Sequence, residues 1–202
     1  MSEFELEVFD RASLHKARKR ALLWEAGNQF AAKGFHGTSM ASIAKGIKLT
    51  KSGLFHYVNT KEELLYQCYE DVLQSAEECL EAAEQAEGDA LDKLSHYIRQ
   101  HLTKLGKPGG YFAMISEIYV LEPEHQKVLR AKAKSADNRL LKLIQNGIDE
   151  GSIGYDNPRM AVYVIDGALN WIPKWYSKTG AESIDEIAEA FIQFFVNGLK
   201  QR

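Results

Sequence analysis

Apolar residues recur along this chain at the spacing of α-helices. Between residues 16 and 33, Leu22, Leu23, Ala26 and Phe30 fall on one helical stripe, the i, i+3, i+4 pattern of a helix that packs on a core. No stretch of the sequence alternates apolar and polar residues over the length of a strand, and only four prolines interrupt the pattern. The chain is therefore predicted to be all-α.

Capping signals divide the N-terminal part into short helices. Gly34 suits the left-handed end of a first helix, and Thr38 or Ser39 begins a second. Thr60 and Glu63 form a capping box that opens a long fourth helix at Lys61. The helices predicted here cover 16–33, 39–47 and 51–57, followed by the long helix from 61.

The rest of the chain continues this pattern. The segment 111–121, YFAMISEIYVL, is apolar on almost every side, which predicts a buried helix. Pro173 lies inside a later helix and predicts a kink. The later helices are predicted over 90–103, 111–121, 124–150, 158–178 and from 184 onward.

Charge is divided unevenly along the sequence. The net charge of the chain is -3, yet residues 11–61 contain ten Lys or Arg and a single acid, Glu25, whereas residues 62–202 contain fifteen Lys or Arg and twenty-three acids. A basic block beside an acidic body is typical of a module that binds a polyanion. Charge alone leaves DNA, RNA and an anionic membrane open.

Three short helices with a basic surface favour a helix-turn-helix. Its turn is predicted at residues 47–49, and the helix from Lys51 would enter the major groove. Lys51, Ser52 and Gly53 are small or polar enough for the backbone to approach the bases. Leu54 and Val58 would anchor the helix from behind.

The stretch from Arg20 to Leu65, above all GFHGTSMASIAKGIKLTKSGLFHYVNTKEEL, resembles the DNA-binding domain of the TetR family. The family pattern implies an all-α fold with an N-terminal three-helix helix-turn-helix domain and a C-terminal helical bundle that binds a ligand and forms a homodimer. We expect an N-terminal arm over 1–15, the DNA-binding domain over 16–60 and the ligand-binding and dimerisation domain over 61–202. The expected function is repression at a palindromic operator of double-stranded DNA.

The resemblance also implies which residues face the operator. Thr38 and Ser39 would offer a hydroxyl and backbone N–H groups to phosphate at a helix N-terminus, and Lys61 would hold another phosphate. His56 is better explained by a phosphate contact than by base reading. Tyr57 is better explained by packing in or beside the core than by a DNA contact. The expected DNA-binding residues are Thr38, Ser39, Lys51, Ser52, Gly53, Phe55, His56, Tyr57 and Lys61.

Two residues depart from the family pattern. Lys48 stands where glycine is frequent in the turn, and a lysine in the left-handed region costs about 1 kcal/mol or more. Gly53 stands where threonine is common, so one side-chain contact to a base is missing. Arg18, Lys19 and Arg20 fit either an arm that contacts DNA or a solvated helix face.

The body is expected to hold a small apolar effector. Phe112, Ile115, Ser116 and Tyr119 share one face of the predicted helix 111–121 and combine apolar area with two hydroxyls, as ligand pockets do. Glu117 is the only charge in that helix and is expected at its solvent edge. Further candidates are Tyr163, Asp166, Asn170, Trp171 and Trp175, although the two tryptophans fit a core or interface equally.

The segment from Gly167 to Gly180 weakly resembles TetR-family members that respond to lipids, which implies a fatty acyl-CoA or related thioester as effector. The alternative is a regulator of efflux or catabolism genes that responds to an aromatic or other hydrophobic compound, or an activator. Broad apolar faces on the last two helices favour a dimer interface over an intrachain core. The expected interface residues are Val162, Ile165, Leu169, Ile172, Phe191, Phe195 and Leu199.

Other classes of function lack their motifs. The sequence has no phosphate-binding glycine loop or nucleophile elbow, and His96 and His101 are five residues apart, off a common helical face. We therefore expect no enzyme, no metal and no cofactor. Cys68 and Cys79 form no zinc or CxxC spacing, and neither a secretory signal nor an apolar membrane segment is evident, so a cytoplasmic protein is expected.

Overall fold

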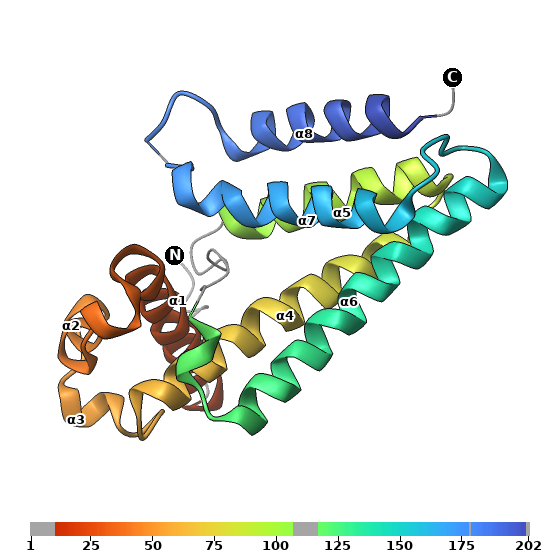
Figure 1. Ribbon diagram of the computed structural model, residues 1–202. Coiled ribbons are helices and arrows are strands. Elements are labelled where there is room, and N and C mark those ends of the chain that lie inside the picture. The colour runs from red at the N-terminus through yellow and green to blue at the C-terminus, as the bar shows by residue number, and fades with distance from the viewer. Residues whose placement is uncertain (1–10, 107–116, 178, 201–202) are drawn as a thin grey trace.

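The computed structural model describes residues 11–106, 117–177 and 179–200, and these residues form an all-α fold (Figure 1). The helices are α1 (Arg11–Gly37), α2 (Met40–Gly46), α3 (Lys51–Leu54), α4 (Lys61–Gln85), α5 (Ala90–Gly106), η1 (Ile118–Val120, a 3-10 turn), α6 (Pro123–Glu150), α7 (Pro158–Trp175) and α8 (Ile184–Leu199). The predicted fold class is confirmed.

Helix boundaries follow the capping chemistry of the sequence. The Ser39, Thr50 and Thr60 side chains accept a hydrogen bond from the third backbone N–H of α2, α3 and α4. Ser183 and Glu186 form a reciprocal capping box at α8. These side chains satisfy backbone donors that have no partner inside the helix.

Two hydrophobic clusters lie at opposite ends of α4. The first half of α4 buries Leu64 and Leu65 with the inner faces of α1, α2 and α3. The second half buries Cys79 and Leu80 with α5 to α8. One continuous helix therefore belongs to both cores, which ties the N-terminal module rigidly to the body.

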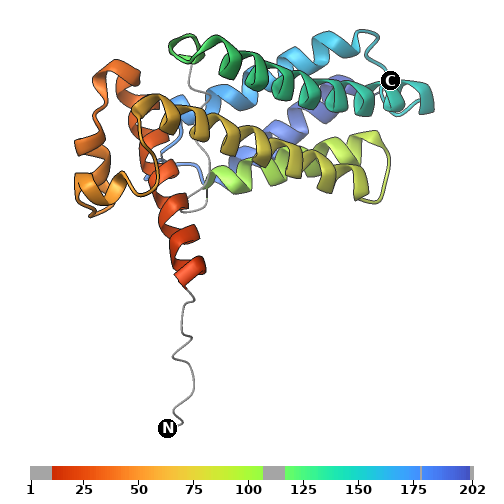
Figure 2. The same cartoon turned by 90° about the horizontal axis from the view of Figure 1, so that it is seen from below.

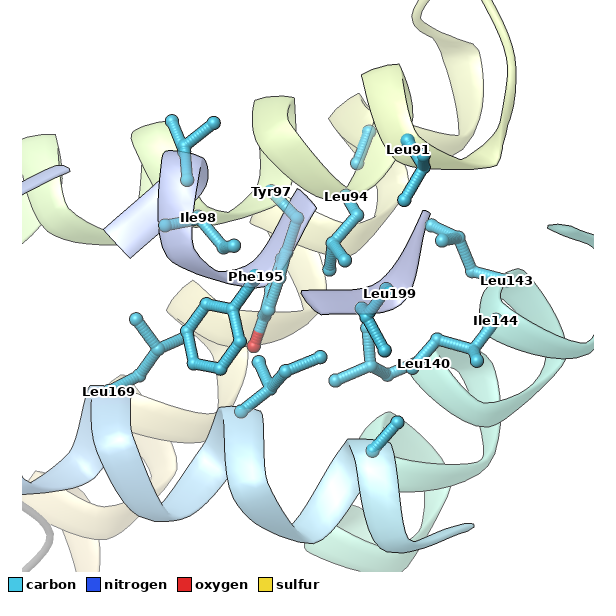
Figure 3. Close-up of a cluster of buried hydrophobic side chains, with 14 of the residues drawn as sticks. Leu91, Leu94, Tyr97, Ile98, Leu140, Leu143, Ile144, Leu169, Phe195 and Leu199 are labelled. Atoms are coloured by element: carbon cyan, nitrogen blue, oxygen red, sulfur yellow. The ribbon is translucent and has the colours of Figure 1, made fainter. Parts of the chain in front are cut away.

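The body core is built between facing helices. α5 packs on α8, and α6 lies beside α4 (Figure 1). Figure 3 shows Tyr97 of α5 reaching into this core beside Leu169 and Phe195. Burial raises the pKa of the Tyr97 hydroxyl, and nearby Asp166 adds to the rise.

Two expectations about helix positions are wrong, and the expected helix end at Gly34 is confirmed. α1 begins at Arg11 rather than 16, so residues 11–15 belong to a helix and not to an arm. In α1, Gly34 has φ 73° and ψ 168°, a conformation open essentially to glycine, and this ends the regular helix where Gly34 was expected to end it. The third helix stops at Leu54 instead of 57.

The predicted buried helix 111–121 is wrong in its described part. Residues 118–120 form a 3-10 turn, and Tyr119 is 64% exposed. Phe112, Ile115 and Ser116 lie outside the described residues. Within the described part of the chain, no helix is long and apolar enough to cross a membrane, and no group of three or more His, Cys, Asp or Glu is placed to hold a metal.

Candidate DNA interface and effector body

A compact corner formed by α2 and α3 holds the candidate recognition helix. Ile43, Ala44 and Leu54 are buried in the N-terminal cluster, so α3 is anchored from behind as predicted. Lys48 in the turn has φ 56° and is the one described residue other than glycine with positive φ. The expected strain at this departure from the family pattern is therefore present.

The tip of α3 presents polar and aromatic side chains to solvent. Lys51, Ser52, Phe55 and His56 are exposed, and the Lys51 ammonium lies 5.9 Å from the centre of the Phe55 ring. The Ser52 hydroxyl lies 3.1 Å from that of Thr50. Their exposure leaves these side chains accessible to a nucleic acid.

Thr38 does not face outward as expected. It is 2% exposed, and its hydroxyl donates to the Gln29 and Gly34 carbonyls at 3.1 and 2.9 Å. Its backbone N–H donates to the Phe35 carbonyl. The assignment of Thr38 to phosphate binding is wrong, because its donors hold the turn after α1.

Lys61 is also used inside the protein. Its ammonium donates to the Phe35 and Thr38 carbonyls at 2.8 and 2.9 Å and lies 4.1 Å from the centre of the Phe35 ring. A phosphate would share the ammonium with these contacts, so the phosphate role expected for Lys61 stays a prediction. Ser39 is exposed and caps α2 through Ser42.

The N-terminal turns of α1 project from the rest of the molecule (Figure 2). His15 stacks on half-buried Tyr57 with ring centres 4.7 Å apart, which favours packing for Tyr57. Lys16, Lys19 and Arg20 line a groove of about 360 Å³ between α1, α4 and α6. Arg18 does not line this groove and stays a candidate for contact with DNA, although all four side chains are exposed.

Glu117 links the body to this module, a role that the sequence did not reveal. Its carboxylate accepts a hydrogen bond from the backbone N–H of Phe35, and the neighbouring Ile118, Val120 and Leu121 pack in the N-terminal cluster. The expected solvent edge is wrong, since Glu117 is half-buried. A lone charge in an apolar segment was the available signal.

The expected effector residues that the structure describes are mostly exposed. Tyr163, Trp171 and Trp175 are 56%, 64% and 48% exposed, so they lie on the outer face of α7 rather than in an enclosed pocket. Tyr119 is also exposed. Among the expected effector residues that the structure describes, Asp166 and Asn170 are half-buried. Burial raises the pKa of Asp166 to about 7, and the nearby Asp137 carboxylate adds to the rise.

The expected interface residues lie on the wrong side of their helices. Six of the seven are at most 8% exposed within one protomer and belong to its core, and Phe191 is half-buried against it. They are Val162, Ile165, Leu169, Ile172, Phe195 and Leu199. Both helices carry more apolar residues than the core of one protomer needs, as predicted. The expected interface residues lie on the side of each helix that packs into that core.

The outer stripe is the one left open. Phe194 of α8 is 75% exposed, and Met160 and Val164 of α7 are 46% and 52% exposed. A Cβ placed on Gly167 or Gly198 would meet no atom within 4 Å. Together with Tyr163, Trp171 and Trp175, these residues form what we call the α7–α8 apolar face.

Two models of known protein families match this chain, one in its N-terminal part and one in its C-terminal part. The model described as bacterial regulatory proteins of the tetR family matches residues 22–68, and the one described as the C-terminal domain of tetracyclin repressor-like proteins matches residues 87–199. The chain belongs to the TetR family of transcriptional regulators.

Named relatives and solved structures agree with this assignment. The transcriptional repressor KstR2 of Mycolicibacterium smegmatis is 22% identical over 95% of both chains. The TetR-family regulator PfmR of Thermus thermophilus is 25% identical, with a TM-score of 0.76 over 89% of this chain and 99% of that one. AibR, solved in complex with isovaleryl coenzyme A and operator DNA, is 24% identical, with a TM-score of 0.72 over 88% of this chain and 97% of that one.

Proposed function

We propose that this TetR-family protein is a dimeric repressor that binds a palindromic operator and is released from it by a small apolar effector. The observation that carries the DNA-binding half is the exposed tip of α3, where Lys51, Ser52, Phe55 and His56 project from a buried anchor. Cations and hydroxyls at the start of a recognition helix suit phosphate oxygens and base edges. Gly53 lets the backbone approach.

Operator binding is tested with the double variant Lys51→Ala, His56→Ala. The operator is a duplex selected from random DNA by the native protein. We expect at least about tenfold weaker binding, because each lost contact to DNA costs about 1–3 kcal/mol. Lys142→Ala is the control, since this exposed lysine lies on α6 in the body. If the double variant bound the operator as tightly as the control, α3 would not be the helix that contacts DNA.

The dimer is proposed to form through the α7–α8 apolar face. Large exposed apolar side chains gathered on two helices are typical of a protein interface, and a two-fold axis would place the same residues of both protomers in contact. Two recognition helices related by that axis read a palindrome at a fixed spacing. Effector binding in the body must favour the spacing that does not fit the operator.

A fatty acyl-CoA is the proposed effector. AibR was solved with isovaleryl coenzyme A, and the segment from Gly167 to Gly180 of this chain weakly resembles TetR-family members that respond to lipids. The test measures operator affinity with isovaleryl-CoA and with palmitoyl-CoA at saturating concentration, and free CoA is the control. Unchanged operator affinity with both thioesters would reject an acyl-CoA as the effector but not the repressor function. Loss of operator binding with free CoA would show that the acyl group is not what the protein responds to.

A further inference from the structure

The C-terminal turns of α1 receive polar contacts from three elements of the body. Lys61, at the start of α4, donates to the Phe35 and Thr38 carbonyls at 2.8 and 2.9 Å. Glu117, before η1, accepts from the Phe35 N–H. Lys174, near the end of α7, donates to the Ala31 carbonyl at 3.3 Å. We call Lys61, Glu117 and Lys174 the α1 clamp.

The charges of the α1 clamp match the backbone groups that they meet. The last carbonyls of a helix have no partner inside the helix and carry partial negative charge, which favours ammonium groups. The Phe35 N–H follows the non-helical Gly34 and finds its acceptor in a carboxylate. Hydrogen bonds to charged groups are about twice as strong as neutral ones.

Gly34 makes room for the carboxylate. Its φ of 73° favours glycine, and a Cβ at this position would lie 3.0 Å from Oε1 of Glu117. Four residues after Glu117, Leu121 is 3% exposed and belongs to the N-terminal cluster. The segment that carries Glu117 is therefore seated on the module through both a polar and an apolar contact.

We infer that the α1 clamp fixes the corner between α1 and α2 relative to the body, and that Glu117 is a positioning residue for operator binding. The Glu117 carboxylate is engaged by the backbone of Phe35. It acts through Phe35 and Thr38, whose backbone leads directly into α2 and so sets the pose of the helix-turn-helix. Because α4, η1 and α7 all hold the same short stretch, a shift of any of them changes that pose.

Glu117→Ala tests the inference by two readouts. Amide hydrogen exchange of residues 34–39 is expected to accelerate about tenfold or more, the factor that corresponds to loss of a hydrogen bond to a charged group. Operator affinity is expected to fall by up to about tenfold, because a smaller fraction of molecules holds the competent pose. Thermal unfolding is measured in parallel, and both readouts are taken well below the midpoint.

Matched variants separate positioning from general damage. Glu117→Gln keeps an oxygen acceptor and is expected to restore most of the protection and affinity. Glu122→Ala removes an exposed carboxylate five residues away that makes no side-chain cap, and it should leave both readouts unchanged. Lys61→Met keeps an apolar stem over Phe35 and should accelerate exchange in the same segment.

Two outcomes would overturn the inference. One is native exchange of residues 34–39 in Glu117→Ala. The other is faster exchange without any loss of operator affinity, which would make the contact structural only. Hydrogen exchange is measured without DNA. If Glu117→Ala accelerated exchange of residues 34–39 and the native protein bound no operator, the proposed function would be rejected and the α1 clamp would stand.

Discussion

The two ends of this molecule treat apolar side chains differently. Around α2 and α3, the large apolar residues are buried and the tip of α3 is mostly polar, with Phe55 as the exposed exception. At α7 and α8, an inner stripe fills the core and an outer stripe is left open. Ten large apolar side chains are exposed among the described residues, and six of them lie on these two helices.

The difference shows what kind of surface each end can bind. A polar and cationic tip gains from meeting phosphates and base edges, which remain hydrated until contact. An aromatic face gains by removing apolar area from water, at roughly 25 cal/mol per Å². The first end buries its large apolar residues within one protomer, apart from Phe55, whereas the second leaves an apolar stripe on each of α7 and α8 for another surface to cover.

The largest effect is expected from breaking the apolar end. Trp171→Glu with Phe194→Glu places two charges on the α7–α8 apolar face, and desolvating them opposes association. We expect the native dimer to separate into monomers of 22.8 kDa and operator affinity to fall by about 100-fold or more, about 2.7 kcal/mol. Native mass spectrometry and fluorescence anisotropy measure the two effects.

Phe55→Glu is the crossed control for that variant. Phe55 is 42% exposed at the tip of α3, so the charge should weaken operator binding and leave the dimer mass unchanged. If both variants lost the dimer, or if the α7–α8 variant stayed dimeric, the contrast between the two ends would fail.

A smaller effect is expected from Asp166, the half-buried carboxyl of the body. Its pKa is raised in the folded protein to about 7 from 3.8, so the folded state binds the proton more tightly than the unfolded chain. The stability that the protonated form contributes is fully present below about pH 4 and is lost as pH rises through 7.

Asp166→Asn cannot ionise and should therefore gain stability relative to the native chain at pH 8, by at most about 4 kcal/mol. It should gain little at pH 4. Chemical denaturation at both pH values measures the difference. Asp156→Asn, in an exposed position before α7, should change neither value; an equal gain for both variants would mean that net charge and not burial is responsible.

The smallest effect concerns the turn of the DNA-binding end. Lys48→Gly relieves a left-handed residue with φ 56° and should raise the free energy of unfolding by up to about 1 kcal/mol. Lys45→Gly, at an exposed position within α2, should lower it by about 1 kcal/mol because glycine weakens a helix. Urea denaturation compares the two, and a loss of stability in Lys48→Gly would contradict the strain.

Local chemistry predicted much of the DNA-binding end. The caps at Ser39 and Thr60 and the break at Gly34 depend on neighbouring residues, which the sequence displays directly. The body was predicted less well for the same reason. A 3.6-residue period marks an apolar stripe on α7, but when a helix is apolar over most of its circumference, the period does not say which side meets its own chain.

The sequence by itself determined the all-α class, the caps, the basic block and the family resemblance, because each is carried by residues close together in the chain. Only the tertiary structure decided that Lys61 and Thr38 hold the end of α1, that Glu117 accepts from Phe35, and that Trp171 and Phe194 face outward. Those contacts join residues as far as 82 positions apart, or depend on which face of a helix its neighbours cover. Spacing along the chain carries no record of either.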